Sequence, residues 1–210
     1  MTRSLDHFIY AGRDLESMRT AFEEMTGIQA NLGGRHPGLG TRNALASLGE
    51  DVYFELLAAD QDQRLEDNMG GRIKDFEVPR MLAYMLKAQD LEAVQQVLTR
   101  HEVASDLFDA ERTTPDGRVL RWRLLVPKEE NPFGDHVPKF IDWLDTTHPA
   151  STSVKGCSFD FFRMGHPRAE ALGKLLVELD CNLDLQRADR PYLQLGVSCP
   201  RGPVVLTSHS

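Results

Sequence analysis

The stretch GGRHPGLGTRNALASLGEDVYFELL, residues 33–57, organises the chain. It begins with a glycine-rich, basic turn that carries His36 and continues into two short strand-like runs. Glycine permits a positive φ and lets another group approach the backbone closely. The second run places Glu55 among apolar residues, where a carboxylate is costly to bury without a partner. The glycine-rich turn and the carboxylate together indicate a functional site.

The bulk composition is typical of a soluble globular protein with one large or two small domains. The chain has 210 residues, of which 41% are hydrophobic and 27% are charged. Its net charge of −8 argues against a nucleic-acid partner, because phosphate binding requires a basic surface. No apolar run approaches the roughly 20 residues that span a bilayer. Early charges argue against a secretory signal, and three cysteines without a CxxC pair favour reduced thiols. We therefore expect a cytoplasmic protein without nucleic-acid or membrane partners.

A pattern of strand, helix and further strands recurs three times along the chain. The expected helix starts at Asp14, Asp90 and His166 are each separated by 76 residues. Because each helix has one apolar stripe, it covers one face of its strands and leaves the other face free to line a cavity. We expect one compact α+β unit with four parts: a first βαβββ module over 1–60, a second βαβ-type module over 78–127, a connecting segment with an FIDW strand over 128–155, and a third βαβ-type module over 156–210.

Four motifs resemble those of a known family. They are Leu5-Asp6-His7, the GGRHPGLGT run with the Asn and Leu that follow it at 33–45, Tyr53-Phe54-Glu55-Leu56, and Phe140-Ile141-Asp142-Trp143. Together they resemble the glyoxalase-like domain branch of the vicinal oxygen chelate (glyoxalase/bleomycin resistance/dioxygenase) superfamily. The resemblance implies tandem βαβββ modules that form a cupped, half-barrel mixed sheet with helices on the outer face. It also implies a small-molecule site on the concave face, in many members with a divalent metal.

Strand alternation puts Tyr53 and Glu55 on one face of their strand, and the resemblance sets His7 beside Glu55. His7 and Glu55 would then be ligands of one divalent metal, Zn, Mn, Ni or Fe. The second module departs from this pattern. Alignment of the helix starts places Ala83 opposite His7, and alignment of RWRLL with YFELL places Arg123 opposite Glu55. A metal-free alternative therefore stays open, in which Glu55 and Arg123 form a buried ion pair.

These features favour a glyoxalase-like small-molecule enzyme of the lyase, isomerase or dioxygenase class, acting on an oxygenated or carboxylate-bearing metabolite. The expected catalytic residues are Glu55 and His36 as bases or ligands, and Arg123 as the group that stabilises negative charge. The residues expected to bind substrate are Arg121, Tyr53, Asp142 and Trp143. The alternative is a non-catalytic protein of the same fold that binds or sequesters a small molecule. Cupped sheets often pair along their edges, so a homodimer stays open, although nothing in the sequence specifies it.

Overall fold

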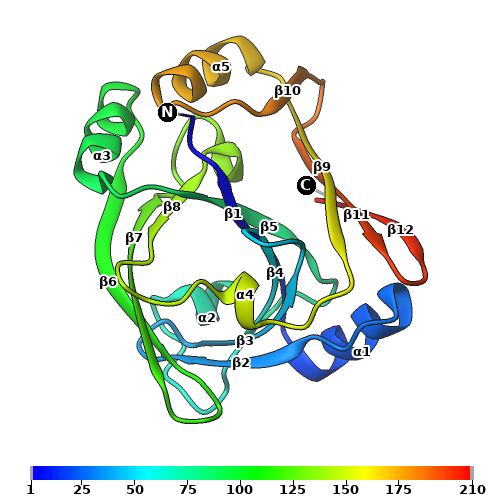
Figure 1. The fold of residues 1–210 in the computed structure, drawn as a ribbon. Helices are drawn as coiled ribbons and strands as arrows, with labels where there is room; N and C mark the ends of the chain where they lie inside the picture. Colours follow the sequence, from blue (N-terminus) through cyan, green and yellow to red (C-terminus); the bar gives the residue numbers. More distant parts are fainter. Residues whose placement is uncertain (1, 209–210) are drawn as a thin grey trace.

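The computed structural model describes residues 2–208 and contains an eight-stranded barrel and a separate four-stranded sheet (Figure 1). The barrel strands are β1 (Leu5–Gly12), β2 (Asn31–His36), β3 (Thr41–Ser47), β4 (Tyr53–Ala59), β5 (Arg80–Lys87), β6 (Ser105–Thr113), β7 (Val119–Pro127) and β8 (Lys139–Asp142). They close in the order β1-β4-β3-β2-β6-β7-β8-β5.

The second sheet and the helices complete the fold. The sheet contains β9 (Ser158–His166), β10 (Asp184–Arg187), β11 (Tyr192–Cys199) and β12 (Gly202–Thr207), in the order β10-β9-β11-β12. The helices are α1 (Leu15–Thr26), α2 (Met69–Ile73), α3 (Leu91–Arg100), α4 (Pro149–Thr152) and α5 (Ala169–Glu178), with a short 3₁₀ turn at Gly134–His136. Across residues 2–208, no helix has the length and apolar character needed to cross a membrane. The expected α+β fold, a curled mixed sheet with helices on its outer face, is confirmed, and the sheet closes fully.

Local sequence signals determine where α1 begins and ends. The side chain of Asp14 caps the helix by accepting a hydrogen bond from the backbone N–H of Ser17 at 2.8 Å. Gly27 ends it in the left-handed conformation, with φ of 81°. The buried face, which includes Leu15 and Phe22, packs against the barrel. The predicted helix start at Asp14 is therefore confirmed.

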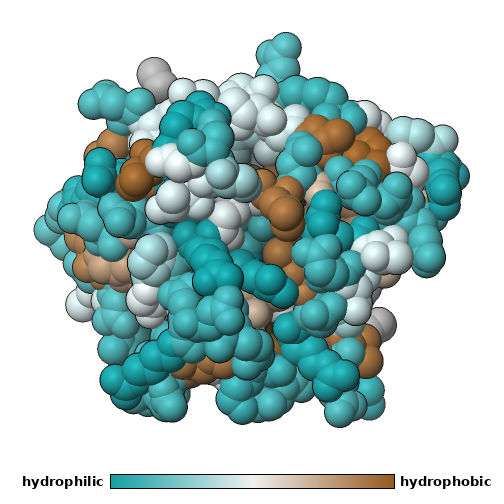
Figure 2. All heavy atoms as spheres, turned by 90° about the horizontal axis from the view of Figure 1, so that it is seen from below, coloured by the Kyte–Doolittle hydropathy of each residue, from teal (hydrophilic) through white to brown (hydrophobic). Residues whose placement is uncertain are grey.

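Alternating side chains divide the apolar residues of the barrel wall into two layers. Outward-facing residues such as Phe8 and Tyr84 join the helices and the second sheet in one core, where the rings of Tyr84 and Phe162 lie 4.7 Å apart. Inward-facing residues such as Ile9 and Ala83 line the barrel interior. Burying one large apolar side chain contributes about 1.5–3 kcal/mol, so the outer core dominates stability. The face seen in Figure 2 is largely hydrophilic, with hydrophobic residues in several separate areas.

Two βαβββ modules form the barrel and share one register. In the first module β1 runs parallel to β4 and places Ile9 beside Glu55. In the second module β5 runs parallel to β8 and places Met85 beside Lys139. The antiparallel pair of β1 and β5 joins the modules and places Ile9 beside Ala83. These pairings fit a two-fold relation in which β5 follows β1 with the 76-residue offset that the sequence predicts, whereas Glu55 and Lys139 are 84 residues apart.

The alignment that placed Arg123 opposite Glu55 is therefore wrong. Strand β8 takes the place of β4 in the second module, whereas β7, which carries Arg123, takes the place of β3. The residue in the register position of Glu55 is Lys139, the first residue of β8. Backbone pairing, rather than the similarity of two apolar runs, determines register, and a strand of four residues is too short to show a clear pattern.

Candidate functional site

The barrel encloses a cavity of about 320 Å³, within the range of small-molecule sites. Much of its wall is apolar. Met69 of α2 and Trp143, which follows β8, also contribute to it. The polar residues that line it from the barrel strands include His7, His36, Thr41, Asn43, Glu55, Arg112 and Lys139. A mostly apolar cavity with a few converging polar groups is the usual form of a ligand site.

His7 lies between two carboxylates. Its Nδ1 lies 2.6 Å from the Oδ1 of Asp6, and its Nε2 lies 3.6 Å from the Oε2 of Glu55. The ring of Tyr53 stacks on the imidazole with centroids 4.4 Å apart. An ionised carboxylate only accepts hydrogen bonds, so Nδ1 carries a proton and donates it to Asp6. Nε2 is then the atom at which His7 can hold or take a proton in the cavity.

Asp6 holds the His7 ring in place through Nδ1, the nitrogen that does not face Glu55. It is fully buried and also accepts hydrogen bonds from Trp143 Nε1 at 3.0 Å and His148 Nε2 at 2.9 Å. Burial raises the pKa of Asp6, but the hydrogen bonds from His148 and His7 outweigh burial and lower it below its usual value. Asp6 therefore stays ionised and ties β1 to the segments around β8 and α4.

Glu55 belongs to a second network. Its Oε1 accepts a hydrogen bond from Asn43 Nδ2 at 2.6 Å, and the same amide lies 3.3 Å from His36 Nε2. An amide nitrogen only donates, so His36 Nε2 accepts, and its Nδ1 donates to Thr41 Oγ1 at 2.9 Å. Burial lowers the pKa of His36 to about 4, which keeps the ring neutral at pH 7. His36 thus reaches the cavity, with both ring nitrogens already engaged.

Arg112 on β6 is the arginine that reaches this wall. It is 5% exposed, and its Nη1 donates to Asn43 Oδ1 at 3.3 Å. Its buried Nε has no hydrogen-bond partner within residues 2–208. A Cβ on Gly33 would lie 2.6 Å from Arg112 Nη1, and a Cβ on Gly34 would lie 2.1 Å from the carbonyl oxygen of Thr113. The paired glycines of the opening motif therefore provide the space in which Arg112 crosses β2.

Five of the residues predicted for the site line the cavity. They are His7, His36, Tyr53, Glu55 and Trp143. The structure brings them together from β1, β2, β4 and the residue after β8, as the resemblance implied for His7 and Glu55. Their catalytic, binding or ligand roles remain predictions.

Three predicted site residues lie elsewhere. Arg123 forms an ion pair with Glu92 of α3 at 2.6 Å, so the metal-free alternative with a Glu55–Arg123 pair is wrong. Arg121 pairs with Glu111 at 3.2 Å. The carboxylate of Asp142 accepts a hydrogen bond from the backbone N–H of Leu144. The reason is strand alternation, because the neighbours Trp122 and Leu124 face inward on β7 and direct both arginines outward.

Several polar residues of the site were missed by sequence reasoning. Asp6 and Asn43 lie inside the motifs that carried the resemblance, so their side chains could have been weighed beside His7 and Glu55. The sequence contained less indication that Arg112 and Lys139 belong to the site, since only strand pairing brings them to the cavity. His148 acts through Asp6 from the segment before α4, which no periodicity predicts.

The donor set for a divalent metal is half complete. The first module offers His7 Nε2 and the Glu55 carboxylate. At the equivalent positions the second module offers Ala83, which has no donor, and Lys139, whose ammonium would repel a cation. Within residues 2–208 no group of three or more His, Cys, Asp or Glu side chains is arranged to hold a metal ion. The residues do not fit the metal centre that the resemblance implies.

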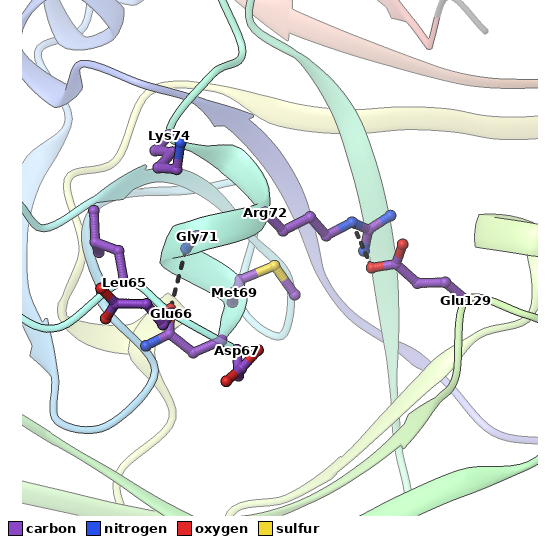
Figure 3. Close-up of a pocket in the computed structure, with 9 residues that line it drawn as sticks. Leu65, Glu66, Asp67, Met69, Gly71, Arg72, Lys74 and Glu129 are labelled. Carbon is purple, nitrogen blue, oxygen red and sulfur yellow. Dashed lines mark hydrogen bonds and ion pairs between the residues drawn. The ribbon is translucent and has the colours of Figure 1, made fainter.

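A second hollow lies beside α2 (Figure 3). Its volume is about 540 Å³, and it opens widely to solvent. Its polar groups are paired locally: Arg72 Nε lies 2.7 Å from Glu129 Oε1, and Asn68 caps the backbone N–H of Gly71. These contacts hold the α2 segment to the loop after β7. The barrel cavity, with its converging polar groups, is therefore the candidate site.

Comparison with known proteins agrees with this geometry. The family of glyoxalase-like domains matches residues 5–179. No curated protein matches the chain. A hypothetical protein from Staphylococcus aureus superposes with a TM-score of 0.63 at 19% identity, over 97% of this chain and 84% of that chain.

Two structures of methylmalonyl-CoA epimerase are also similar. A variant of the Streptomyces coelicolor enzyme, in complex with 2-nitronate-propionyl-CoA, gives a TM-score of 0.51 at 13% identity, over 70% of this chain and 98% of that one. An epimerase in complex with methylmalonyl-CoA and NH4+ gives 0.51 at 14% identity, over 71% and 100%. At these identities the likeness shows the fold alone. The family match covers most of the chain, and the chain therefore belongs to the glyoxalase-like domain family of the vicinal oxygen chelate superfamily.

Proposed function

We propose that this protein is an enzyme that transfers a proton on a small, carboxylate- or oxygen-bearing metabolite inside the barrel. The observation that carries this proposal is the pair formed by His7 Nε2 and Glu55 Oε2, 3.6 Å apart on the cavity wall. Asp6 orients His7 from behind, and Asn43 orients Glu55. Two groups that can share one proton at a cavity are suited to general acid–base catalysis.

In this reaction one member of the pair removes a proton from the substrate and the pair returns it. Negative charge develops on the substrate when the proton leaves. Arg112, buried beside Asn43 with its Nε unpaired, would stabilise that charge. The role that the sequence gave to Arg123 thus passes to Arg112. Proton transfer of this kind serves both the lyase and the isomerase classes.

The structural neighbours support this class of reaction by analogy. Two of them are named as methylmalonyl-CoA epimerases, and one is bound to methylmalonyl-CoA, whose acyl group carries a carboxylate. An epimerase is an isomerase. We therefore place the expected substrate among small carboxylates, or their thioesters, with an acidic C–H next to a carbonyl.

Solvent deuterium exchange tests the proposal. The protein would be incubated in D2O with a panel of 2-oxo acids, 2-methyl dicarboxylic acids and acyl thioesters, and loss of the C–H signal followed by proton NMR. We expect exchange of at least one compound, slowed about 100-fold or more by Glu55→Gln because general acid–base catalysis contributes that much. Arg123→Gln is the matched control and should leave the rate unchanged. Equal exchange by wild type and Glu55→Gln would contradict the proposal.

The cavity wall also supports a second candidate, a non-catalytic binding protein. Trp122 and Trp143 lie with ring centroids 5.2 Å apart, and much of the remaining wall is apolar. Such a wall suits the sequestration of a small aromatic or acidic ligand. A ligand that stabilises the protein against heat and is recovered unchanged, with no deuterium incorporated, would favour this candidate.

A further inference from the structure

The two-fold relation between the modules identifies Lys139 as the counterpart of Glu55. Glu55 of β4 lies beside Ile9, and Lys139 of β8 lies beside Met85. The two modules therefore place a carboxylate and an ammonium at the same register position of one cavity. A symmetric metal site would need a donor at both positions, and the ammonium of Lys139 reverses the charge at one of them.

The charge of Lys139 is only partly compensated, because burial and Arg72 lower the pKa of its ammonium while Asp135 and Glu129 raise it. It is 6% exposed and lines the cavity. Its Nζ lies 3.9 Å from Asp135 Oδ1, beyond hydrogen-bond distance, and that carboxylate already accepts a hydrogen bond from Arg72. Burial lowers the pKa of Lys139, so a negative group placed beside its Nζ would favour the ammonium. A buried lysine of this kind is suited to binding an anion.

Arg112 supplies a second buried cation on the same cavity. Its Nε is unpaired within residues 2–208, and its Nη1 contacts only the neutral oxygen of Asn43 in this site. Glu55, the carboxylate nearest this network, already accepts from Asn43. The cavity thus presents an unsatisfied cation from β6 and another from β8.

We infer that Lys139 provides the positive charge of the second module in place of a divalent metal, and that the cavity takes a dicarboxylate. One carboxylate of the substrate binds the Lys139 ammonium, and Arg112 offers a second, separate cation on the same cavity. The inference rests on the proposed function, because it names the substrate class and a further binding residue of the same site. No step of the reaction then passes through a bound metal.

Binding of malonate is the first test, since malonate is a small dicarboxylate. Calorimetry would compare wild type with Lys139→Met. Lys174→Met is the control, because Lys174 is exposed on α5 and pairs with Glu170 at 2.9 Å, away from the cavity. We expect Lys139→Met to weaken malonate binding about tenfold or more, as for loss of one charge-assisted contact. We expect Lys174→Met to change it less than about twofold. The inference is overturned if malonate fails to bind wild type, or binds Lys139→Met equally well.

Metal binding is the second test and needs no substrate. Wild type and Lys139→Glu would be titrated with Zn²⁺ and Mn²⁺. We expect the wild type to show no stoichiometric site that depends on Glu55. Lys139→Glu gives each module one carboxylate and should gain affinity of about tenfold or more, whereas the uncharged Lys139→Gln should gain less. A stoichiometric wild-type site that Glu55→Gln removes would overturn the inference.

The two proposals fail separately. If a metal binds the wild-type cavity but Glu55→Gln still stops deuterium exchange, the inference about Lys139 falls and the proposed enzyme stands. If malonate binding depends on Lys139 while Glu55→Gln leaves exchange unchanged, the binding site stands and the proposed chemistry falls.

Discussion

The two barrel modules share one backbone plan and differ in what they direct into the cavity. In the first module β1 and β4 present His7 and Glu55, each held by a partner: Asp6 for His7 and Asn43 for Glu55. In the second module the equivalent positions on β5 and β8 present Ala83 and Lys139. The first module also contributes its histidine turn and paired glycines, whereas the second contributes much of the apolar wall.

This difference shows how a duplicated fold can produce a one-sided site. Backbone pairing repeats because outward-facing apolar residues are similar in the two modules, as with Phe8 and Tyr84 in the outer core. Inward-facing residues are freer to differ between the two modules, because the alternate residues on each strand already form the outer core. We therefore expect substitutions of the polar cavity residues of the first module to change the chemistry, and substitutions of outward-facing polar residues of the second, such as Arg123 and Asp142, to change it little.

The largest expected effect is on Asp6, which positions His7. Asp6→Asn removes the charge that fixes the proton on His7 Nδ1, so we expect kcat for the exchange reaction to fall about 10²–10⁴-fold. The pH profile should also shift, which loss of packing alone would not cause. Asp142→Asn, on the outer side of β8, is the control and should leave kcat unchanged. Circular dichroism would verify that both variants fold, and an unaltered kcat in Asp6→Asn would contradict this role.

The next effect is the pH dependence that His36 gives to stability. Its pKa in the folded state is about 4, below the roughly 6.5 of an unfolded chain. Its contribution is therefore fully present above pH ~6.5 and is lost as the pH falls toward 4, up to about 3 kcal/mol. Urea unfolding at several pH values should show a shallower loss for His36→Gln than for wild type. His101, on the surface beside Glu178, provides the control variant His101→Gln. Parallel curves for wild type and His36→Gln would contradict this expectation.

A smaller effect concerns the paired glycines. A Cβ at Gly33 would lie 2.2 Å from Asn43 Oδ1 and 2.6 Å from Arg112 Nη1. Gly33→Ala should therefore reduce the free energy of unfolding by about 1–3 kcal/mol and weaken malonate binding. Gly173 in α5 is the matched control, because a Cβ there meets only an ordinary contact at 3.8 Å. Gly173→Ala should stabilise the protein by about 0.5–1 kcal/mol. If both variants change stability in the same direction, the account of Gly33 fails.

The smallest effect is expected at Arg123, the residue that the sequence placed in the cavity. Its ion pair with Glu92 lies on the outer face, where solvent screens it. Arg123→Gln should leave malonate affinity and the thermal midpoint within experimental error. Arg112→Gln, by contrast, should weaken malonate binding markedly, because Arg112 is buried at the cavity. Similar losses of malonate affinity in both variants would contradict the distinction between Arg112, which lines the cavity, and Arg123, which faces outward.

Local features of the sequence determined a large part of the fold. The cap residues Asp14 and Gly27 delimited α1, and the helix starts at Asp14 and Asp90 gave the offset between the two barrel modules, because capping and amphipathic periodicity act over a few neighbouring residues. The third start, expected at His166, was wrong, since His166 ends β9 and α5 begins at Ala169.

Alternation along β4, which is also a local feature, placed Tyr53 and Glu55 on one face, and the family resemblance set His7 beside Glu55. This part of the first-module half was therefore predictable, whereas Asp6 and Asn43 were missed.

Tertiary structure alone decided the other half. The choice between Arg123 and Lys139 depended on whether β7 or β8 pairs in the place of β4, and pairing is a contact between distant segments that no local pattern encodes. Arg112 reached the cavity only because β6 lies beside β2, where Gly33 and Gly34 leave room for its side chain. The sequence by itself determined which residues share a face on β1 and on β4. Barrel closure determined which charges meet them, because closure brings together strands that are far apart in the chain.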